Sequence, residues 1–312
     1  MKKRTLRADI LLILTATIWG FAFVAQRVGM DYVGPFTFNA VRFALGSLSL
    51  IPLLLFNHRQ EIKYRKILPG RNRKMSLSAG CFAGLALYLG ASLQQVGLIY
   101  TTAGKAGFIT GLYVVIVPIM GLFWRQRPEL GTWAGALLAA VGLYLLSVTG
   151  KFTISYGDLL VLAGAFFWAS HVHLVGWFSA RVGSIKLAFL QFAVCSFLSF
   201  ITAFAVESIS LQSILRGLLP ILYGGFMSVG IAYTLQVVAQ QEANPAHASI
   251  ILSLESVFAA VGGWILLSET LPVRGLIGCG LMLSGMLLSQ FNITADSLRT
   301  FMKAFPTRTT ST

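Results

Sequence analysis

The sequence predicts an all-α integral membrane protein in which ten transmembrane helices form two inverted five-helix repeats. Three observations predict this fold: the composition, the internal repetition and the distribution of charge. The chain has 312 residues, of which 56% are hydrophobic and 11% charged, and its mean hydropathy is +0.77. Soluble domains carry about 25% charged residues, so this composition excludes a soluble fold.

Ten apolar stretches are long enough to cross a bilayer core of about 30 Å, which needs roughly 20 residues per helix. They are expected near 8–29, 35–56, 76–97, 102–124, 130–149, 157–177, 186–206, 216–239, 246–267 and 273–291. The longest polar segments that remain are a loop at 57–75 and a tail of about twenty residues. They leave no room for a separate soluble catalytic domain.

The second half of the chain repeats the first. Residues 9–50 align without a gap on 158–199, and a later register pairs residues 142 positions apart. Matching residues include Asp9 and Asp158, Trp19 and Trp168, Phe43 and Phe192, and Gln94 and Gln236. Five spans per repeat is an odd number, so the second repeat enters the membrane inverted. This pattern is typical of secondary transporters, whose two halves surround a site near the midplane.

These registers divide the chain into three parts. We expect a first repeat at 1–149, a second repeat at 150–292 and a cytoplasmic tail at 293–312.

The distribution of charge predicts the orientation in the membrane. Of the 24 Lys and Arg residues, eighteen fall on the side that holds both termini, and four (Arg27, Lys151, Arg216 and Arg274) fall on the other. By the positive-inside rule both termini lie in the cytoplasm, and the protein is expected in the cell (inner) membrane. The basic loop at 57–75 is expected to touch anionic lipid. The net charge of +14 therefore does not indicate nucleic-acid binding.

Ionisable residues at membrane depth are candidates for function. Glu255 is the one carboxylate deep within an apolar span, and its repeat mate is Tyr113. An ionised carboxylate there must be paired, hydrated or protonated, so Glu255 either binds a substrate amine, pairs with a cation, carries a proton or joins helices. Arg42 lies about 10 Å into its span. It either holds an anionic group, pairs inside the bundle or donates hydrogen bonds to backbone carbonyls in a structural role.

Two further basic residues are repeat mates near opposite faces of the membrane. Lys105 stands near the outer face and His247 near the inner face, each at a helix start. Equivalent positions of this kind are expected to form the outer and inner gates of one pathway. The alternative interpretation is that Lys105 snorkels to the interface and that His247 is an ordinary helix-start residue.

A set of polar and aromatic residues is expected around a central cavity: Trp19, Trp168, His171, Gln94 and Gln236. The two tryptophans lie in mid-span rather than at the interface, where they either floor a pocket for apolar, aromatic or cationic ligands or pack helices together. His173 points about 200° away from His171 on the same helix, which argues against a metal site. The three cysteines also lack metal-ligand spacing, so neither a metal nor a cofactor is expected.

Five segments together resemble the EamA-like branch of the drug/metabolite transporter superfamily. They are WGFAFVAQRVG (19–29), NAVRFALGSL (39–48), YTTAGKAGFITGLYVVIVPI (100–119), GDLLVLAGAFFWASHVHLVG (157–176) and LSLESVFAAVGGWILLSETL (252–271). The resemblance implies that spans 1–4 and 6–9 surround a cavity, with spans 5 and 10 to the side. The family often has Asn at the position of Lys105. The acidic residue that ends its fourth span is present only in the second half, as Glu269.

The leading hypothesis is a secondary transporter, an exporter of small organic solutes such as amino acids or metabolites by alternating access, with protons as a coupled ion. The alternative is a lipid-carrier flippase or a non-catalytic membrane subunit of an envelope-synthesis complex. An enzyme is not expected, because no HExxH, DxD or phosphate-loop motif occurs. The protein is expected to act as a monomer or homodimer.

Overall fold

The computed structural model describes residues 3–64, 73–101, 103–126, 128–147, 155–267 and 272–289, and all regular structure in these ranges is helical. Eight helical segments there are long and apolar enough to cross a membrane, and two shorter apolar helices, Leu130–Leu146 and Val273–Ser289, accompany them. The predicted all-α membrane fold is therefore confirmed. Residues 65–72 of the expected loop at 57–75, the expected tail at 293–312 and Glu269 lie outside the described residues.

The described part of the first repeat contains seven helices. They are α1 (Lys3–Gly29), α2 (Pro35–Ser49), α3 (Ile51–Tyr64), α4 (Arg73–Tyr100), α5 (Ala103–Gly111), α6 (Tyr113–Phe123) and α7 (Leu130–Ser147). The loop predicted at 57–75 is shorter than expected, because α3 continues to Tyr64 and α4 begins at Arg73.

The second repeat follows the same order. Its elements are α8 (Tyr156–Val182), α9 (Ser184–Val206), α10 (Leu211–Arg216), α11 (Leu218–Leu222), the π-helix η1 (Tyr223–Tyr233), α12 (Thr234–Ala239), α13 (Pro245–Leu252), α14 (Glu255–Leu267) and α15 (Val273–Ser289). The span predicted at 216–239 thus includes eleven π-helical residues. A π-helical turn is a feature that often accompanies a functional site.

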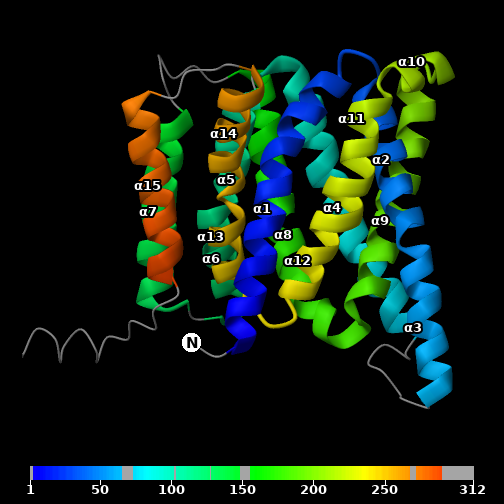
Figure 1. The fold of residues 1–312 in the computed structure, drawn as a ribbon, viewed down its shortest axis with the longest axis horizontal. Coiled ribbons are helices and arrows are strands. Elements are labelled where there is room, and N and C mark those ends of the chain that lie inside the picture. The colour runs from blue at the N-terminus through cyan, green and yellow to red at the C-terminus, as the bar shows by residue number, and fades with distance from the viewer. Residues whose placement is uncertain are drawn as a thin grey trace, which may run out of the picture.

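The two repeats run in opposite directions and pack against each other. Figure 1 shows α1 beginning at the lower face of the bundle, beside the start of α13, which His247 joins to Asp9 of α1. The start of α8 lies at the opposite end, where Asp158 contacts Thr101 after the end of α4. We call these two faces the α1 end and the α8 end. Helices α4 and α8, which belong to different repeats, pack along their lengths.

A carboxylate of the second repeat binds the free amides at the start of a helix of the first repeat. Pro35 occupies the first turn of α2, where a missing N–H costs nothing. The next two amides, of Phe36 and Thr37, donate to the two carboxylate oxygens of Glu207 after α9, each at 2.8 Å. A carboxylate at this place satisfies free amides and the positive end of the helix dipole.

Helices α7 and α15 stand together at one side of the bundle (Figure 1). Glycines bring their backbones into contact: a Cβ on Gly135 would lie 2.6 Å from the carbonyl oxygen of Gly285, and one on Gly142 would lie 2.6 Å from that of Gly278. Small residues permit this close approach of membrane helices. The pairing leaves the other spans to form the central cavity.

The fourth span of each repeat is interrupted at an equivalent position. Helix α5 ends at Gly111 and α6 begins at Tyr113, whereas α13 ends at Leu252 and α14 begins at Glu255. At both breaks the helix tightens, because the amides of Leu112 and Leu254 bond to carbonyls three residues earlier. Tyr113 and Glu255, which are repeat mates, each follow such a break.

Candidate functional site

A small cavity of about 40 Å³ lies between the two repeats. It is lined by Trp19, Phe23, Gln26, Arg42, Gln94, Thr110, Tyr113, Trp168, His171, Val172, Ser228, Tyr233, Gln236, Leu252 and Glu255. These residues come from α1, α2, α4, α5, α6, α8, η1, α12, α13 and α14. Eight of the ten residues expected at a site from the sequence line it. Of the other two, His247 does not line it, and the side chain of Lys105 lies outside the described residues.

An aromatic cluster centred on Tyr233 forms one wall of the cavity. The Tyr233 ring lies 4.4 Å from that of Trp19 and stacks on Trp168 at 6.1 Å, measured between ring centroids. His171 meets the same ring edge-on at 6.1 Å. Both indole N–H groups bond to the protein, with Trp19 donating to the carbonyl oxygen of Ser228 and Trp168 to the side chain of Gln94. A ligand can therefore meet these rings through their π-faces rather than their N–H groups.

Gln94 organises the polar side of the cavity. Its amide oxygen accepts from the Trp168 indole at 3.0 Å and from the Thr110 hydroxyl at 3.3 Å. Its amide nitrogen donates to the side-chain oxygen of Gln26 at 3.2 Å. Its repeat mate Gln236 is less engaged, since the side-chain oxygen of Gln236 has no hydrogen-bond partner in the part of the chain that the structure describes. Gln236 can therefore still accept a hydrogen bond from a ligand, whereas the side-chain oxygen of Gln94 already accepts two.

Glu255 is 5% exposed and lies in the first turn of α14. Its Oε1 accepts a hydrogen bond from the hydroxyl of Tyr113 at 3.3 Å. No Lys or Arg forms an ion pair with this carboxylate among the described residues. A buried carboxylate without a counter-ion is stable only when a proton, a cationic ligand or water compensates its charge.

Arg42 is the guanidinium of the cavity, with 2% of its surface exposed. Its Nε donates to the side-chain oxygen of Asn39 at 3.0 Å. The guanidinium carbon lies 4.9 Å from the ring centroid of Phe43 and 5.4 Å from that of Phe38. Arg42 forms no ion pair within the described ranges. Its terminal N–H groups suit a carboxylate or another planar anion.

The two histidines of α8 have different surroundings. His171 lies on the cavity and its Nε2 is 3.0 Å from the side-chain oxygen of Gln191. His173 faces α6, where its Nε2 is 2.8 Å from the carbonyl oxygen of Val117, and its ring lies 4.8 Å from that of Trp124. The histidines therefore share no ligand site.

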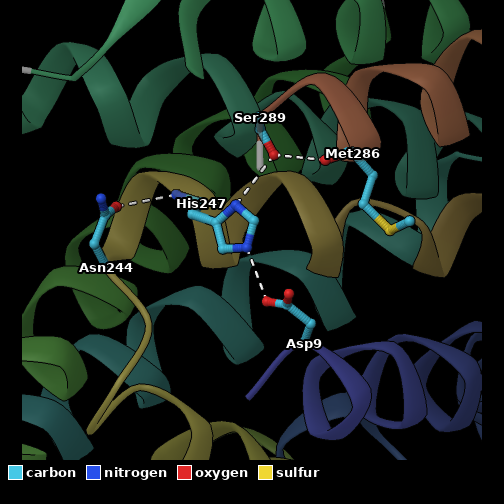
Figure 2. A network of polar contacts seen from close by, with 5 residues as sticks. All are labelled: Asp9, Asn244, His247, Met286 and Ser289. Atoms are coloured by element: carbon cyan, nitrogen blue, oxygen red, sulfur yellow. Dashed lines mark hydrogen bonds and ion pairs between the residues drawn. The ribbon is translucent and has the colours of Figure 1, made fainter. Parts of the chain in front are cut away.

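His247 lies at the α1 end, near Asp9 and Ser289 (Figure 2), and is not among the residues that line the cavity. Asn244 caps α13 by accepting a hydrogen bond from the His247 amide at 3.1 Å. The imidazole lies between two side chains, with Nε2 2.9 Å from Oδ1 of Asp9 and Nδ1 3.1 Å from the hydroxyl of Ser289. It connects α13 with α1 and α15. The side chain of Lys105, in the first turn of α5, lies outside the described residues.

Several residues of this arrangement were not expected from the sequence as site residues, and two of them, Tyr233 and Asp9, make central contacts. Tyr233 has no polar counterpart in the first repeat, where Ala91 occupies the matching position. Its place three residues before Gln236 on one helical face was the available signal. Asp9 was recognised as a repeat mate of Asp158, but its contact with His247 joins residues 238 positions apart. Sequence periodicity carries no information on such a contact.

The fold and the cavity together define a multi-pass helical membrane transporter built from two repeats. The model of the EamA-like transporter family matches residues 6–148 and 155–291, which together span nearly the whole chain. The protein belongs to the EamA-like transporter family.

Relatives in this family carry transporter names. An uncharacterized transporter of Archaeoglobus fulgidus is 32% identical over 292 residues, covering 93% of this chain and 88% of its own. A protein of Salmonella typhimurium named a probable amino-acid metabolite efflux pump is 24% identical over 298 residues, covering 90% of this chain and 94% of its own. A solved crystal structure shares the fold with a TM-score of 0.74 at 19% identity, over 90% of this chain and 96% of that one.

Proposed function

We propose that this protein is a secondary transporter that exports amino acids or similar small organic solutes from the cell by alternating access. The observation that carries the proposal is the pairing of unlike charges in one cavity: Arg42 and Glu255 both line it, and they form no ion pair with each other. A zwitterionic solute supplies a carboxylate for the one and an ammonium group for the other. The names of the efflux-pump relatives agree with this class of substrate.

Each part of the cavity then has a separate role in binding. Arg42 binds the carboxylate of the solute through paired N–H groups. The rings of Trp19, Trp168 and Tyr233 contact its side chain, or its ammonium group by a cation–π interaction. Glu255 binds the ammonium group or carries a proton in exchange for it. Gln94 and His171 shape the polar wall between these groups.

The orientation and the gates are part of the same proposal. Both termini lie in the cytoplasm, so the α1 end faces the cytoplasm and the α8 end faces outward, in agreement with the excess of Lys and Arg on the inner side. His247 and Lys105 act near the inner and outer gates. The repeats comprise 1–149 and 150–292, and the basic loop at 57–75 touches anionic lipid.

Transport into proteoliposomes tests the proposal. The purified protein is expected to give saturable flux of radiolabelled neutral amino acids, and an imposed pH gradient is expected to change its rate. Glu242→Gln, which alters an exposed carboxylate outside the cavity, is the matched control and keeps the wild-type flux. Absence of amino-acid flux from folded protein, together with movement of a fluorescent lipid between leaflets, would establish the flippase alternative instead.

A further inference from the structure

Asp9 and Asp158 are repeat mates, 149 positions apart, and lie at opposite ends of the bundle. Asp9 joins the first helix of its repeat to the fourth span of the other repeat, and Asp158 joins the first helix of its repeat to the end of the third span of the other. We propose that these two carboxylates are the positioning residues of the two gates: the Asp9 contact closes the α1 end and the Asp158 contact closes the α8 end. The inference rests on the proposed alternating access and adds the residues that hold each end shut.

The contact at the α1 end is buried. Asp9 is 2% exposed, and its Oδ1 lies 2.9 Å from Nε2 of His247 at the start of α13. Figure 2 shows the imidazole between Asp9 and Ser289, so that one ring joins α1 of the first repeat to α13 and α15 of the second. The second carboxylate oxygen of Asp9 has no hydrogen-bond partner among the described residues. His247 is therefore the main group that compensates the buried negative charge of Asp9.

The contact at the α8 end also joins the two repeats. Asp158 is 6% exposed, and its Oδ1 accepts a hydrogen bond from the hydroxyl of Thr101 at 2.5 Å. Thr101 follows the end of α4, the third span of the first repeat, and its amide donates to the carbonyl oxygen of Gly97 in α4. The Oδ2 of Asp158 accepts from the amide of Ser155 at 2.8 Å, which completes a capping box at the start of α8. The cap fixes the carboxylate in the position from which it holds Thr101.

The cavity lies midway between the two contacts. Trp19 follows Asp9 by ten residues on α1, and Trp168 follows Asp158 by ten residues on α8. Each tryptophan is therefore about 15 Å further along the helix axis than the aspartate of its own helix. Because α1 and α8 run in opposite directions, one carboxylate lies on each side of the shared cavity. Each contact must break before the helices that it joins can separate at that end.

Both contacts are formed in this structure, and their chemistry differs. The α1 end is held by a carboxylate with an imidazole, and the α8 end by a carboxylate with a hydroxyl. Loss of one contact favours opening at that end by about tenfold, because a hydrogen bond to a charged group typically contributes that much to an equilibrium. The other end stays closed, since its own contact is intact. If the two contacts served folding alone, their loss would lower the stability of the protein without favouring opening at one particular end.

Accessibility of a cysteine in the cavity tests the inference without any substrate. Cys81, Cys195 and Cys279 are replaced by Ala, and Ser228→Cys places a single thiol on the cavity wall. A membrane-impermeant methanethiosulfonate reagent is then applied to each face in turn, in sealed vesicles of both orientations. Asp9→Ala is expected to raise labelling from the α1 end about tenfold. Labelling from the α8 end should stay the same or fall. Asp158→Ala is expected to do the reverse.

Milder variants and a control complete the experiment. His247→Gln and Thr101→Val leave both carboxylates in place, and each is expected to change labelling in the same direction as removal of its partner. Asp31→Ala removes an exposed carboxylate that pairs with Arg27 on the surface. This control should leave labelling from both faces unchanged. Equal changes from both faces, or none in the folded variants, would overturn the inference. Sided labelling from a protein that moves no amino acid would leave the gates intact and refute the substrate class alone.

Discussion

Tyr113 and Glu255 are repeat mates, 142 positions apart, and they hydrogen bond to each other at 3.3 Å. A residue that contacts its own mate must lie beside the pseudo-twofold axis that relates the repeats. Phe43 and Phe192 repeat this relationship, with ring centroids 6.3 Å apart. The axis therefore passes through the region of the cavity, where the two repeats present different chemistry at equivalent positions: a phenol against a carboxyl.

The charge on Arg42 is expected to select ligands that carry a carboxylate. Arg42→Gln should weaken amino-acid binding by about tenfold to a hundredfold, because a charge-assisted hydrogen bond contributes roughly 1.5–3 kcal/mol. Arg42→Lys should recover part of the loss, since the ammonium group keeps the charge without the paired geometry. Thermal-shift titration of the purified variants with an amino acid and with the corresponding carboxamide measures both effects. Arg181→Gln, on an exposed side chain, is the control.

The carboxamide decides whether Arg42 acts through charge. It should bind the wild-type protein and Arg42→Gln with similar affinity, since it offers no negative charge to lose. An equal loss of affinity for both ligands would instead show that Arg42 shapes the cavity without binding the anion.

Glycines between α7 and α15 are expected to determine stability and not transport. Gly278→Ala places a methyl group 2.6 Å from the carbonyl oxygen of Gly142, and such overpacking costs about 1–3 kcal/mol. Gly280→Ala, on the same helix, meets nothing within 4 Å and should leave the melting temperature in detergent unchanged. Equal melting temperatures for the two variants would contradict the packing described here. Ligand affinity should be the same in both, because neither glycine lines the cavity.

The orientation of the chain can be read from reporter fusions. A reporter that is active only outside the cytoplasm should be active when fused at Lys151 or Arg274 and inactive at Arg65 or Thr312, because basic loops are retained inside. A reversed pattern would place the α1 end outside and exchange the two proposed gates.

The repeat and the hydropathy were sufficient to predict the helical membrane fold, because both depend on patterns within the chain. The same registers placed Trp19 with Trp168 and Gln94 with Gln236, and all four residues line the cavity. The interruption of α5–α6 and α13–α14 was not predicted, because Leu112 and Leu254 are apolar residues that continue the helical pattern. Backbone breaks at such residues arise from tertiary packing.

Contacts between segments far apart in the chain could not be predicted from the sequence either. Tyr233 becomes the centre of an aromatic cluster only when η1 packs against α1 and α8. Asp9 meets His247 because α1 and α13 begin at the same end of the bundle, a consequence of the inverted repeat that no local pattern records.

The most direct test of the proposed mechanism is the pH dependence of transport by Glu255→Gln. This variant keeps a side-chain oxygen for the Tyr113 hydroxyl but cannot titrate. We predict that this variant folds, still binds a neutral ligand and loses the pH dependence of transport between about pH 5.5 and 8. The wild-type protein and Glu242→Gln should both keep that pH dependence. A Glu255→Gln variant with the wild-type pH profile would contradict the role of Glu255 as the proton or ammonium site and leave it as a structural link between helices.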